Sequence, residues 1–325
     1  MSIQVGIIGT GWFGKMHGDL LSQMEGVSVA AITGTSMEKA EMFAAHYAGA
    51  KGFDDPLRML DEVKLDAVYI TVPPMAHGEI ELALIERGIP FFVEKPVGID
   101  IETPERILKA LEAKPVVNAV GYHFRYKESI QMMKELIEGS IVGFAEGVWM
   151  GDMPGVAWWR DEALSGGQFI EQTTHIVDLL RYTAGEVTEV YATFANQVLQ
   201  QKYDGVTVPD VGTVSMKLAN GAIATISNTC ILPSGIGKTG LSLYTDHGIL
   251  DWTPERLEVE AEGVKTTYHS KGNPYEAEST AFIHAVRTGD ESHLLSNYAD
   301  AVVTQKVTCA VVQSAKIGQA VKLHY

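Results

Sequence analysis

The first part of the chain alternates between short apolar runs and longer amphipathic stretches. The runs contain no charged residue, which is typical of strands buried on both faces of a parallel sheet. They cover Ile3–Ile8, Val27–Thr33, Ala67–Val72, Phe91–Val93 and Val116–Val120. Because helical stretches separate them, we predict an open, doubly wound α/β domain of the Rossmann type over residues 1–121.

The segments between the apolar runs carry signals of helix starts and ends. One helix is expected from the glycine-rich loop after the first run to about Met24. A second is expected at Met75–Arg87, where Gly88 supplies the C-terminal cap. Thr103 and Pro104 have the residue types of an N-cap and a first helical position, so we expect the next helix to begin there.

After Gly121 the pattern changes, and strands dominate. The expected strands are Val142–Met150, Val187–Ala195, Val211–Ala219, Ala222–Ile231, Gly240–Tyr244, Leu257–Ala261 and Val264–Tyr268. Asn220–Gly221 lies between two of them and predicts a tight hairpin. Helices are expected at Ser129–Glu138, Tyr275–Arg287 and Tyr298–Gly318. We therefore predict a second, α+β domain over residues 122–325 with a large, mainly antiparallel open sheet.

Composition narrows the class of protein. The chain has 325 residues and a formal net charge of −16, which argues against nucleic acid or an anionic membrane as a partner. No apolar run is long enough for a transmembrane helix, and the N-terminus lacks the basic region of a signal peptide, so a cytoplasmic location is expected. Cys230 and Cys309 fit no paired motif, and no residue spacing indicates a metal site.

A glycine motif follows the first predicted strand. Gly9, Gly11 and Gly14 have the G-x-G-x-x-G spacing, with Trp12 and Phe13 between the second and third glycines. The first glycine allows a tight turn, the second leaves room for a pyrophosphate, and the third lets helix and strand pack closely. The helix N-terminus then offers free N–H groups to phosphates. Because the motif joins a buried strand to a helix, it predicts dinucleotide binding.

The end of the second strand favours NADP over NAD. NAD enzymes usually place Asp or Glu there to bind the adenosine ribose, whereas this chain has Thr35 and Ser36. No carboxylate would repel a 2′-phosphate, both hydroxyls can donate hydrogen bonds, and Lys39 can add positive charge. The alternative is that the two hydroxyls only cap the helix that begins near Met37.

Further motifs follow the later strands and continue into the second domain. They are Thr71-x-Pro73-x-x-x-His77, Glu94–Lys95–Pro96, Gly121–Tyr122-x-x-Arg125, Trp158–Trp159–Arg160 with Gly166–Gly167, and Glu171-x-x-x-His175-x-x-Asp178. In this order they resemble the glucose–fructose oxidoreductase and inositol dehydrogenase family, written Gfo/Idh/MocA. The closing stretch, Tyr275–Leu323, is also similar to that family, so the resemblance covers essentially the whole chain.

The resemblance implies a Rossmann domain followed by a domain with an open sheet. It also implies oxidation or reduction of sugars, inositols or related polyols with NAD(H) or NADP(H). By position, Lys95 resembles the lysine near the nicotinamide and the reacting oxygen, and His175 resembles the proton-transferring histidine. Glu171 stands where many members have Asp, which leaves its role less secure. The motifs of Thr71, Pro73, His77 and Glu94 fall on the cofactor side.

The chemistry of alcohol oxidation fits these residues. A base must take the proton from oxygen as the hydride leaves carbon, and histidine titrates near neutral pH. A lysine ammonium can polarise the same oxygen, and Pro96 restricts Lys95 to an extended conformation. On a helix, Glu171 and His175 would share a face. The carboxylate would then either orient the imidazole or contact substrate hydroxyls.

Other polar residues have two interpretations each. Tyr122 and Arg125 would either contact cofactor or substrate or pack together where the domains join. The Trp158–Arg160 cluster would either stack on a sugar ring or anchor a loop. Asp178 is expected on a helix surface or near substrate hydroxyls, and His17 is expected to be structural.

The leading hypothesis is an NADP-preferring dehydrogenase or reductase for a sugar, polyol or keto-sugar. One alternative is a non-catalytic dinucleotide-binding sensor. Another is an enzyme that holds NAD tightly and uses transient oxidation for elimination or hydrolysis. The exposed face of the second sheet is expected to form a homodimer or homotetramer.

Overall fold

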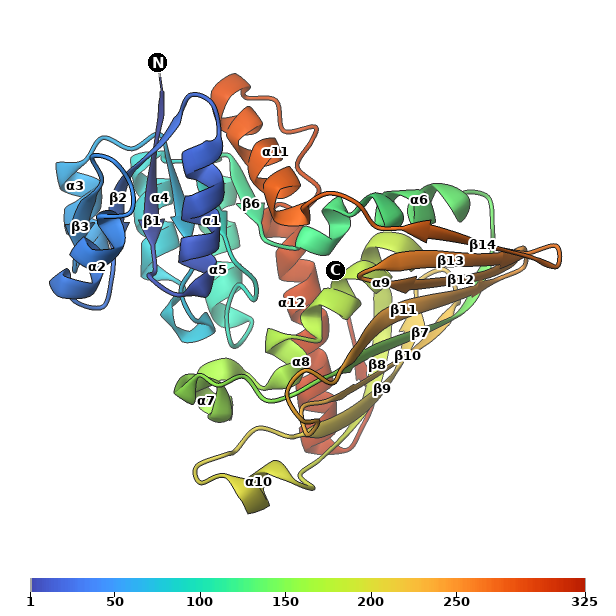
Figure 1. Ribbon diagram of the computed structural model, residues 1–325. Coiled ribbons are helices and arrows are strands. Elements are labelled where there is room, and N and C mark those ends of the chain that lie inside the picture. Colours follow the sequence, from blue (N-terminus) through green and yellow to red (C-terminus); the bar gives the residue numbers. More distant parts are fainter. Residues whose placement is uncertain (1, 325) are drawn as a thin grey trace. The chain divides into compact units, whose positions relative to one another are not determined.

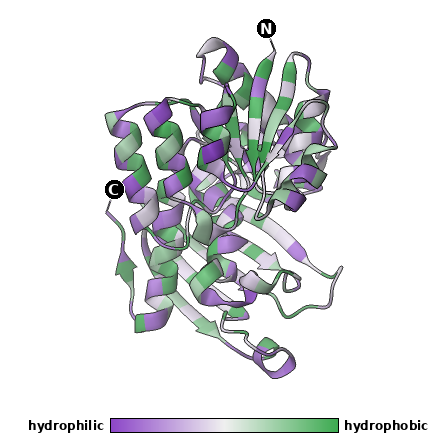
Figure 2. Cartoon of the chain, turned by 90° about the vertical axis from the view of Figure 1, so that its left-hand side faces the viewer, coloured by the Kyte–Doolittle hydropathy of each residue, from purple (hydrophilic) through white to green (hydrophobic). Residues whose placement is uncertain are grey.

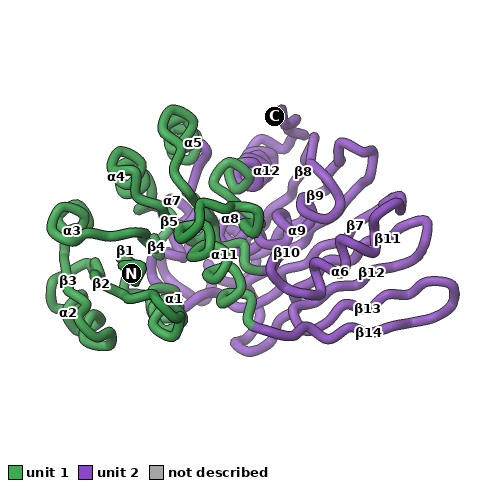
Figure 3. The backbone as a smooth tube through the Cα atoms, turned by 90° about the horizontal axis from the view of Figure 1, so that it is seen from above, with its two compact units in different colours: residues 1–98, 102–123, 273–302 green, residues 99–101, 124–272, 303–325 purple. Residues whose placement is uncertain are grey.

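The computed structural model describes residues 2–324, which divide into two compact units (Figures 1 and 3). The first comprises the chain up to Gly98 together with Glu102–His123 and Asn273–Val302; the second comprises Ile99–Ile101, Phe124–Gly272 and the chain from Val303 onward. Residues 273–302 pack with the first unit although they follow the second sheet in the sequence.

Unit 1 is built on a six-stranded parallel sheet with the order β3-β2-β1-β4-β5-β6. The strands are β1 (Ile3–Ile8), β2 (Val27–Thr33), β3 (Lys51–Phe53), β4 (Ala67–Ile70), β5 (Phe91–Val93) and β6 (Asn118–Val120). Its helices are α1 (Trp12–Gln23), α2 (Met37–Ala44), α3 (Pro56–Glu62), α4 (Glu79–Arg87), α5 (Glu102–Ala113) and α11 (Pro274–Thr288). This order is that of a doubly wound sheet, so the predicted Rossmann fold is confirmed.

Three local features of unit 1 differ from the sequence-based expectation. β3 and α3 were not predicted, although Asp55 caps α3 and Pro56 opens it. The helix expected from Met75 begins later, at Glu79, because Gly78 has a φ of 126°, which is not a helical conformation. The helix expected to begin at Pro104, with Thr103 as its N-cap, begins two residues earlier, at Glu102.

The core of unit 1 explains why α11 belongs to it. Phe282 and Ile283 of α11 lie in the same buried cluster as the sheet residues Tyr69 and Phe92. Tyr69 and Phe92 stack with ring centroids 4.8 Å apart, and Phe282 meets both rings edge-on at 5.5 and 5.9 Å. Hydrophobic residues concentrate along the strands of this sheet (Figure 2). A segment far along the sequence therefore completes the core of unit 1.

Unit 2 contains a nine-stranded sheet with the order β14-β13-β12-β11-β7-β10-β9-β8-β15. The strands are β7 (Val142–Met150), β8 (Val187–Ala195), β9 (Val211–Leu218), β10 (Ile223–Thr229), β11 (Lys238–Thr245), β12 (Gly248–Thr253), β13 (Arg256–Ala261), β14 (Val264–His269) and β15 (Val321–Lys322). Only β7 and β10 pair in parallel, which confirms the mainly antiparallel sheet. β12 and β15 were not predicted. The expected hairpin joins β9 to β10, with Gly221 at a φ of 91°.

Helices cover one face of this sheet. They are α6 (Glu128–Leu136), α9 (Thr174–Ala184) and the C-terminal part of α12 (Tyr298–Ile317), and shorter helices are α7 (Glu162–Ser165), α8 (Gln168–Glu171) and α10 (Leu199–Lys202). The buried cluster includes Ile176 and Leu180 from α9, Val214 and Ile226 from the strands, and Val311 from α12. None of the helices within residues 2–324 has the length and apolarity that a membrane crossing requires.

Candidate functional site

The glycine loop has the geometry that its spacing predicts. Gly9 adopts a φ of 116°, and a Cβ there would lie 2.6 Å from the carbonyl oxygen of Thr71. At Gly14 a Cβ would lie 2.2 Å from the carbonyl oxygen of Gly9, so helix and loop approach too closely for a side chain. A Cβ on Gly11 would meet no atom of the described chain within 4 Å. Open space therefore lies at the glycine expected to face a pyrophosphate.

The start of α1 leaves its N–H groups available. Gly11 is the N-cap, no side chain caps it within the described chain, and the first turn carries no acidic residue. Trp12 is 66% exposed and lies edge-on to Phe13, with ring centroids 4.9 Å apart. The positive end of the helix dipole is thus exposed beside a large apolar ring, which suits the phosphates and flat rings of a dinucleotide.

At the end of β2, both interpretations of the hydroxyl residues have support. The Oγ of Ser36 accepts a hydrogen bond from the Lys39 amide at 3.3 Å, so Ser36 does cap α2. The Lys39 ammonium donates to the Thr35 hydroxyl at 3.2 Å, and both side chains are exposed. The charge of Lys39 therefore lies next to Thr35, where contacts to a 2′-phosphate were predicted from the sequence.

The loop after β4 supports the glycine loop. The Thr71 hydroxyl donates to the carbonyl oxygens of Ile8 and Gly9, at 3.1 and 3.3 Å. Pro73 then precedes a short 3₁₀ turn, Pro74–Ala76. Thr71 thus helps to fix the turn that the dinucleotide would contact.

His77 and Glu81 form a buried pair at the start of α4. His77 Nδ1 lies 2.6 Å from Glu81 Oε1, and the Gly78 amide donates to Glu81 Oε2 at 2.7 Å. Burial acts to raise the pKa of Glu81, but His77 and the backbone amides outweigh it and hold that pKa below its usual value. The pair therefore fixes the loop that leads into α4.

Glu94 and Lys95 follow the carboxyl end of β5, where doubly wound sheets bind ligands. Glu94 Oε1 lies 2.7 Å from His17 Nε2, and both side chains are buried. A Cβ on Gly121 would lie 2.8 Å from Glu94 Oε2, so the glycine gives this carboxylate its space. The Lys95–Pro96 peptide bond is cis. His17 therefore holds the carboxylate of the residue that precedes Lys95.

Two residues of this region were not predicted from the sequence as part of the site. Glu278 of α11 is 1% exposed, and its carboxylate oxygens lie within 4.8 Å of the ligand atoms of His17 and Glu94. Burial and the neighbouring Glu94 raise the pKa of Glu278 well above its usual value. Burial, Glu94 and Glu278 likewise raise the pKa of Tyr275, whose ring stacks on His123 at 4.2 Å. The spacing of Glu278 with Phe282 places a carboxylate on the apolar face of α11, which is the signal that could have found it.

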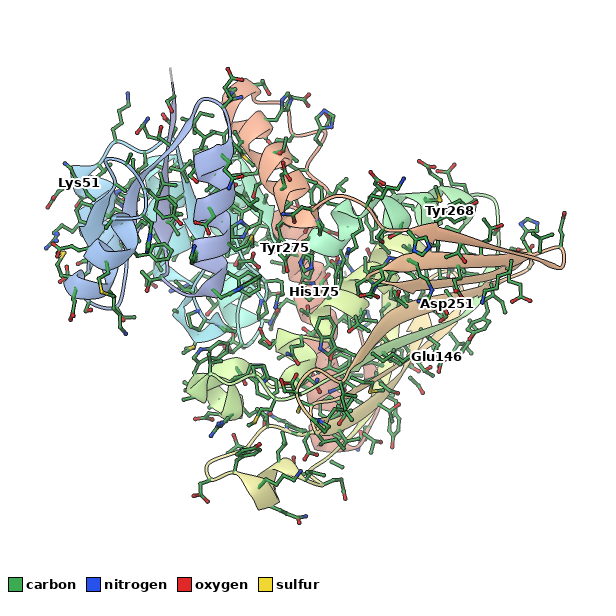
Figure 4. The ribbon with its side chains drawn as sticks, in the orientation of Figure 1. Lys51, Glu146, His175, Asp251, Tyr268 and Tyr275 are labelled. Atoms are coloured by element: carbon green, nitrogen blue, oxygen red, sulfur yellow. The ribbon has the colours of Figure 1, made fainter. Side chains whose placement is uncertain are left out.

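In unit 2, His175 lies in the first turn of α9 among aromatic rings (Figure 4). Its imidazole stacks on Trp149 with ring centroids 5.6 Å apart and an interplanar angle of 16°, and it lies 5.1 Å from Phe124. The side chain is buried. These contacts fix the plane of the imidazole.

Glu171 and His175 do not lie on one continuous helix, so the expectation that a single helix carries both is wrong. Glu171 ends α8 and His175 belongs to α9, with Gln172 and Thr173 between the two helices. Glu171 Oε2 instead accepts a hydrogen bond from Trp159 Nε1 at 2.9 Å. Trp159 therefore orients the Glu171 carboxylate.

Arg125 and Asp178 form a buried, two-pronged ion pair. Arg125 Nε and Nη2 donate to the two carboxylate oxygens at 2.8 and 2.6 Å, and the Thr304 hydroxyl adds a bond of 3.1 Å. Asp178 is 1% exposed, so the expected position on a helix surface is wrong. Tyr122 is also buried. The pair ties the segment after β6 to α9, one turn beyond His175.

The central residue of the Trp158–Arg160 cluster, Trp159, anchors its loop. Trp159 is fully buried against Leu199, Val208 and Cys230, and Trp158 packs at the edge of the same cluster. The Arg160 guanidinium lies over a tyrosine ring, 5.3 Å from its centroid. The packing of Trp159 supports the loop-anchor interpretation, whereas Trp158 and Arg160 stay predicted substrate contacts.

The fold brings together side chains that no spacing in the sequence reveals. One ligand-type atom from each of His17, Glu94 and Glu278 lies within 4.8 Å of the others, and His284, Asp290 and His293 form a second such group nearer the surface. In the first group, the 2.7 Å separation of Glu94 and His17 is that of a hydrogen bond. The absence of a metal site stays a prediction.

Comparison with known proteins gives a consistent result. The family described as "Oxidoreductase family, NAD-binding Rossmann fold" matches residues 3–122. The "GFO/IDH/MocA C-terminal domain" matches residues 130–251. The first match falls almost wholly in unit 1, and the second falls in unit 2.

Individual relatives are distant but extend over the whole chain. The scyllo-inositol 2-dehydrogenase (NAD(+)) of Bacillus subtilis is 23% identical, over 99% of this chain and 96% of its own. The uncharacterized oxidoreductase YrbE of the same organism is 24% identical, over 99% and 97%. A solved levoglucosan dehydrogenase in complex with NADH and levoglucosan is 21% identical and covers 100% of both chains, with a TM-score of 0.90. That similarity in structure shows the shared fold.

Proposed function

Because this chain belongs to the Gfo/Idh/MocA family of NAD-binding oxidoreductases, we propose that it transfers a hydride between a nicotinamide and a carbon of a sugar, polyol or keto-sugar. The observation that carries the proposal is the glycine loop: Gly11 has open space around it for a ligand, and Gly9 and Gly14 allow the tight turn and the close packing that hold the loop in this position. Residues 1–121 would bind the nucleotide, and residues 122–325 would bind the substrate.

The residues of unit 1 fit a dinucleotide. Gly9, Gly11, Gly14 and the exposed start of α1 would hold the pyrophosphate, with Trp12 and Phe13 beside it. When bound, the nicotinamide gives or accepts the hydride. Further contacts are proposed for the loops after β4 and β5, through Thr71, Pro73, His77, Glu94 and Lys95.

The finer proposal for the cofactor is a preference for NADP. Lys39 and Thr35 support it, because their ammonium and hydroxyl groups, 3.2 Å apart, can both donate hydrogen bonds to the oxygens of a 2′-phosphate. Residues 33–36 place no carboxylate there to bind the ribose of NAD.

The proton chemistry is assigned to one residue from each unit. The Lys95 ammonium would bind the reacting oxygen and stabilise the negative charge that develops on it. The His175 imidazole, fixed by Trp149, would take the proton on oxidation and return it on reduction. Glu171, oriented by Trp159, would accept hydrogen bonds from substrate hydroxyls.

The names of the relatives suggest which substrates to try first. They include myo-inositol, scyllo-inositol and levoglucosan dehydrogenases. We therefore propose a cyclic polyol or sugar, with candidate contacts from Tyr122, Arg125, Trp158 and Arg160 as well as Glu171.

The test is a turnover assay with inositols, anhydrosugars, aldoses and keto-sugars, each with NADP(H) and NAD(H). We expect turnover with at least one of them, and its loss by a factor of roughly 10²–10⁴ in Lys95→Met with little change in cofactor affinity. Cofactor binding without turnover of any compound would indicate a sensor instead. Cofactor that copurifies and returns unchanged after substrate consumption would indicate elimination or hydrolysis.

We also propose a homodimer or homotetramer formed through the open face of the nine-stranded sheet. Phe144, Tyr191, Ile223 and Tyr244 are exposed there, an unusual set of large apolar side chains for neighbouring strands in water. Light scattering should give a multiple of the chain mass, and Tyr244→Glu should lower it. The proposed location is the cytoplasm.

A further inference from the structure

Two buried carboxyl groups lie together beneath the end of β5. Glu94 comes directly after that strand, and Glu278 comes from α11, which returns to unit 1 after the whole of the second sheet. Their oxygens lie within 4.8 Å of each other, and the two side chains are 4% and 1% exposed. Two carboxylates in so small a buried space cannot both carry a full negative charge without a large free-energy cost.

The two carboxyl groups differ in their partners. Glu94 Oε1 lies 2.7 Å from His17 Nε2, so Glu94 has a hydrogen-bond partner in this buried space. Neither oxygen of Glu278 has a hydrogen-bond partner among the described residues, and the Glu94 carboxylate acts on it electrostatically. The group that loses its charge most readily is therefore Glu278.

We propose that Glu278 is a neutral carboxylic acid in the folded protein at neutral pH, and that it acts as a positioning residue for Lys95. The neutral state lets Glu94 stay charged and bonded to His17, and Glu94 in turn fixes the backbone to which Lys95 belongs. This step rests on the proposed function of Lys95. The groups that face Glu278 are His17 from α1, Glu94 after β5 and Tyr275 from α11, whose ring stacks on His123.

A proton fits this place better than a metal ion. A metal bound by His17, Glu94 and Glu278 would hold each ligand atom at about 2.0–2.2 Å and would keep the ligand atoms apart from one another. The hydrogen-bond distance between Glu94 and His17 leaves no such separation. Burial and Glu94 together raise the pKa of Glu278 well above its usual 4.5, which agrees with a bound proton.

The proposal predicts a specific dependence of stability on pH. In the unfolded chain Glu278 ionises near its usual pKa, whereas in the folded protein it keeps its proton to a higher pH. Between these two values the folded state binds one more proton than the unfolded state, so stability falls as pH rises. Glu278→Gln has no such proton. For each unit by which the pH rises in that interval, the ratio of its folding equilibrium constant to that of the wild type should therefore increase about tenfold.

The matched control is Glu276→Gln. Glu276 lies on the same helix and is exposed, so it has the same chemistry without the burial. Its unfolding free energy, measured by urea denaturation, should follow the wild type across the pH range. If Glu278→Gln also follows the wild type, the proposal is wrong.

Two readouts separate the protonation state from catalysis. Carbon-13 NMR of protein labelled at the glutamate carboxyl carbons should show one neutral carboxyl at pH 7, absent from Glu278→Gln; if that variant does not fold, Glu278→Met serves for the assignment. The kcat of the wild type should fall at high pH as Glu278 ionises, and Glu278→Gln should lack this fall. The NMR and stability results need no substrate, so they hold or fail independently of the proposed turnover.

Three outcomes would overturn the inference. One is a Glu278 carboxyl that titrates near the ordinary glutamate pKa of about 4.3. Another is one equivalent of a divalent metal in the purified protein that disappears in Glu278→Gln. The third, given active enzyme, is an unchanged pH profile of kcat in that variant, which would leave Glu278 neutral but without influence on Lys95.

Discussion

At the scale of single residues, one glycine of the loop is needed for folding and another for ligand binding. Gly11 and Gly14 belong to the same motif but differ in their surroundings. A Cβ on Gly14 would collide with the Gly9 carbonyl, whereas a Cβ on Gly11 would meet no atom of the described chain within 4 Å. The packing of the chain therefore requires Gly14, and the approach of a ligand requires Gly11.

We expect Gly14→Ala to destabilise the protein by about 1–3 kcal/mol, because the backbone must shift to admit the methyl group. Gly11→Ala should change the unfolding free energy by less than about 1 kcal/mol, the scale of an N-cap change, while cofactor affinity falls. Urea denaturation and titration with NADPH measure the two effects. Equal losses of stability in both variants would contradict this division of roles.

Lys39 tests the cofactor preference at the same scale. Lys39→Ala should lower the affinity for NADPH by roughly tenfold, the loss of one charge-assisted hydrogen bond, and leave NADH binding nearly unchanged. Lys51→Ala is the control, because Lys51 is an exposed lysine of the same unit at the start of β3 (Figure 4). An unchanged ratio of the NADPH and NADH dissociation constants in Lys39→Ala would remove the basis for NADP.

At the scale of elements, polar pairs at strand and helix ends hold the loops of the site. Glu81 binds both the His77 side chain and the Gly78 amide, so it fixes the entry into α4. Arg125 and Asp178 do the same between the segment after β6 and α9. Loops at the carboxyl ends of strands are thereby tied down before any ligand binds.

Glu81 gives a second pH prediction, with the opposite sign to Glu278. Its folded pKa is lowered despite burial, so its stabilising effect is present above the ordinary glutamate pKa and is lost as pH falls through the lower, folded value. Glu81→Gln should therefore cost about 1–3 kcal/mol at pH 7 and less as the pH falls below about 4. Urea denaturation at several pH values measures this; a cost that does not change with pH would contradict it.

The sequence predicted those elements that have strong periodicity or clear caps. Strands such as β1 and β2 were predicted to the residue, because they are continuous apolar runs, and the β9–β10 hairpin followed from Asn220–Gly221. β3 was missed because its three residues carry no pattern. The break between Glu171 and His175 was missed because no proline or glycine marks Gln172 or Thr173.

At the scale of the whole molecule, motifs and long-range contacts differ in what a sequence can reveal. Lys95 and His175 were proposed because the local motifs that contain them resemble those of the family. Glu278 was not, because its partners His17 and Glu94 are far away in the sequence and only the return of α11 to the first unit brings the three together. Trp159 likewise reaches Glu171 only through the fold.

The central claim is that one ammonium and one imidazole, from different units, act on the same oxygen of the substrate. Its most direct test is a crystal structure of the protein with NADPH and a polyol or sugar ligand that the turnover assay identifies. The account predicts that Lys95 Nζ and a ring nitrogen of His175 both lie at about 2.6–3.2 Å from one ligand oxygen, on the carbon that faces the nicotinamide. A complex in which either side chain points away from that oxygen would contradict it.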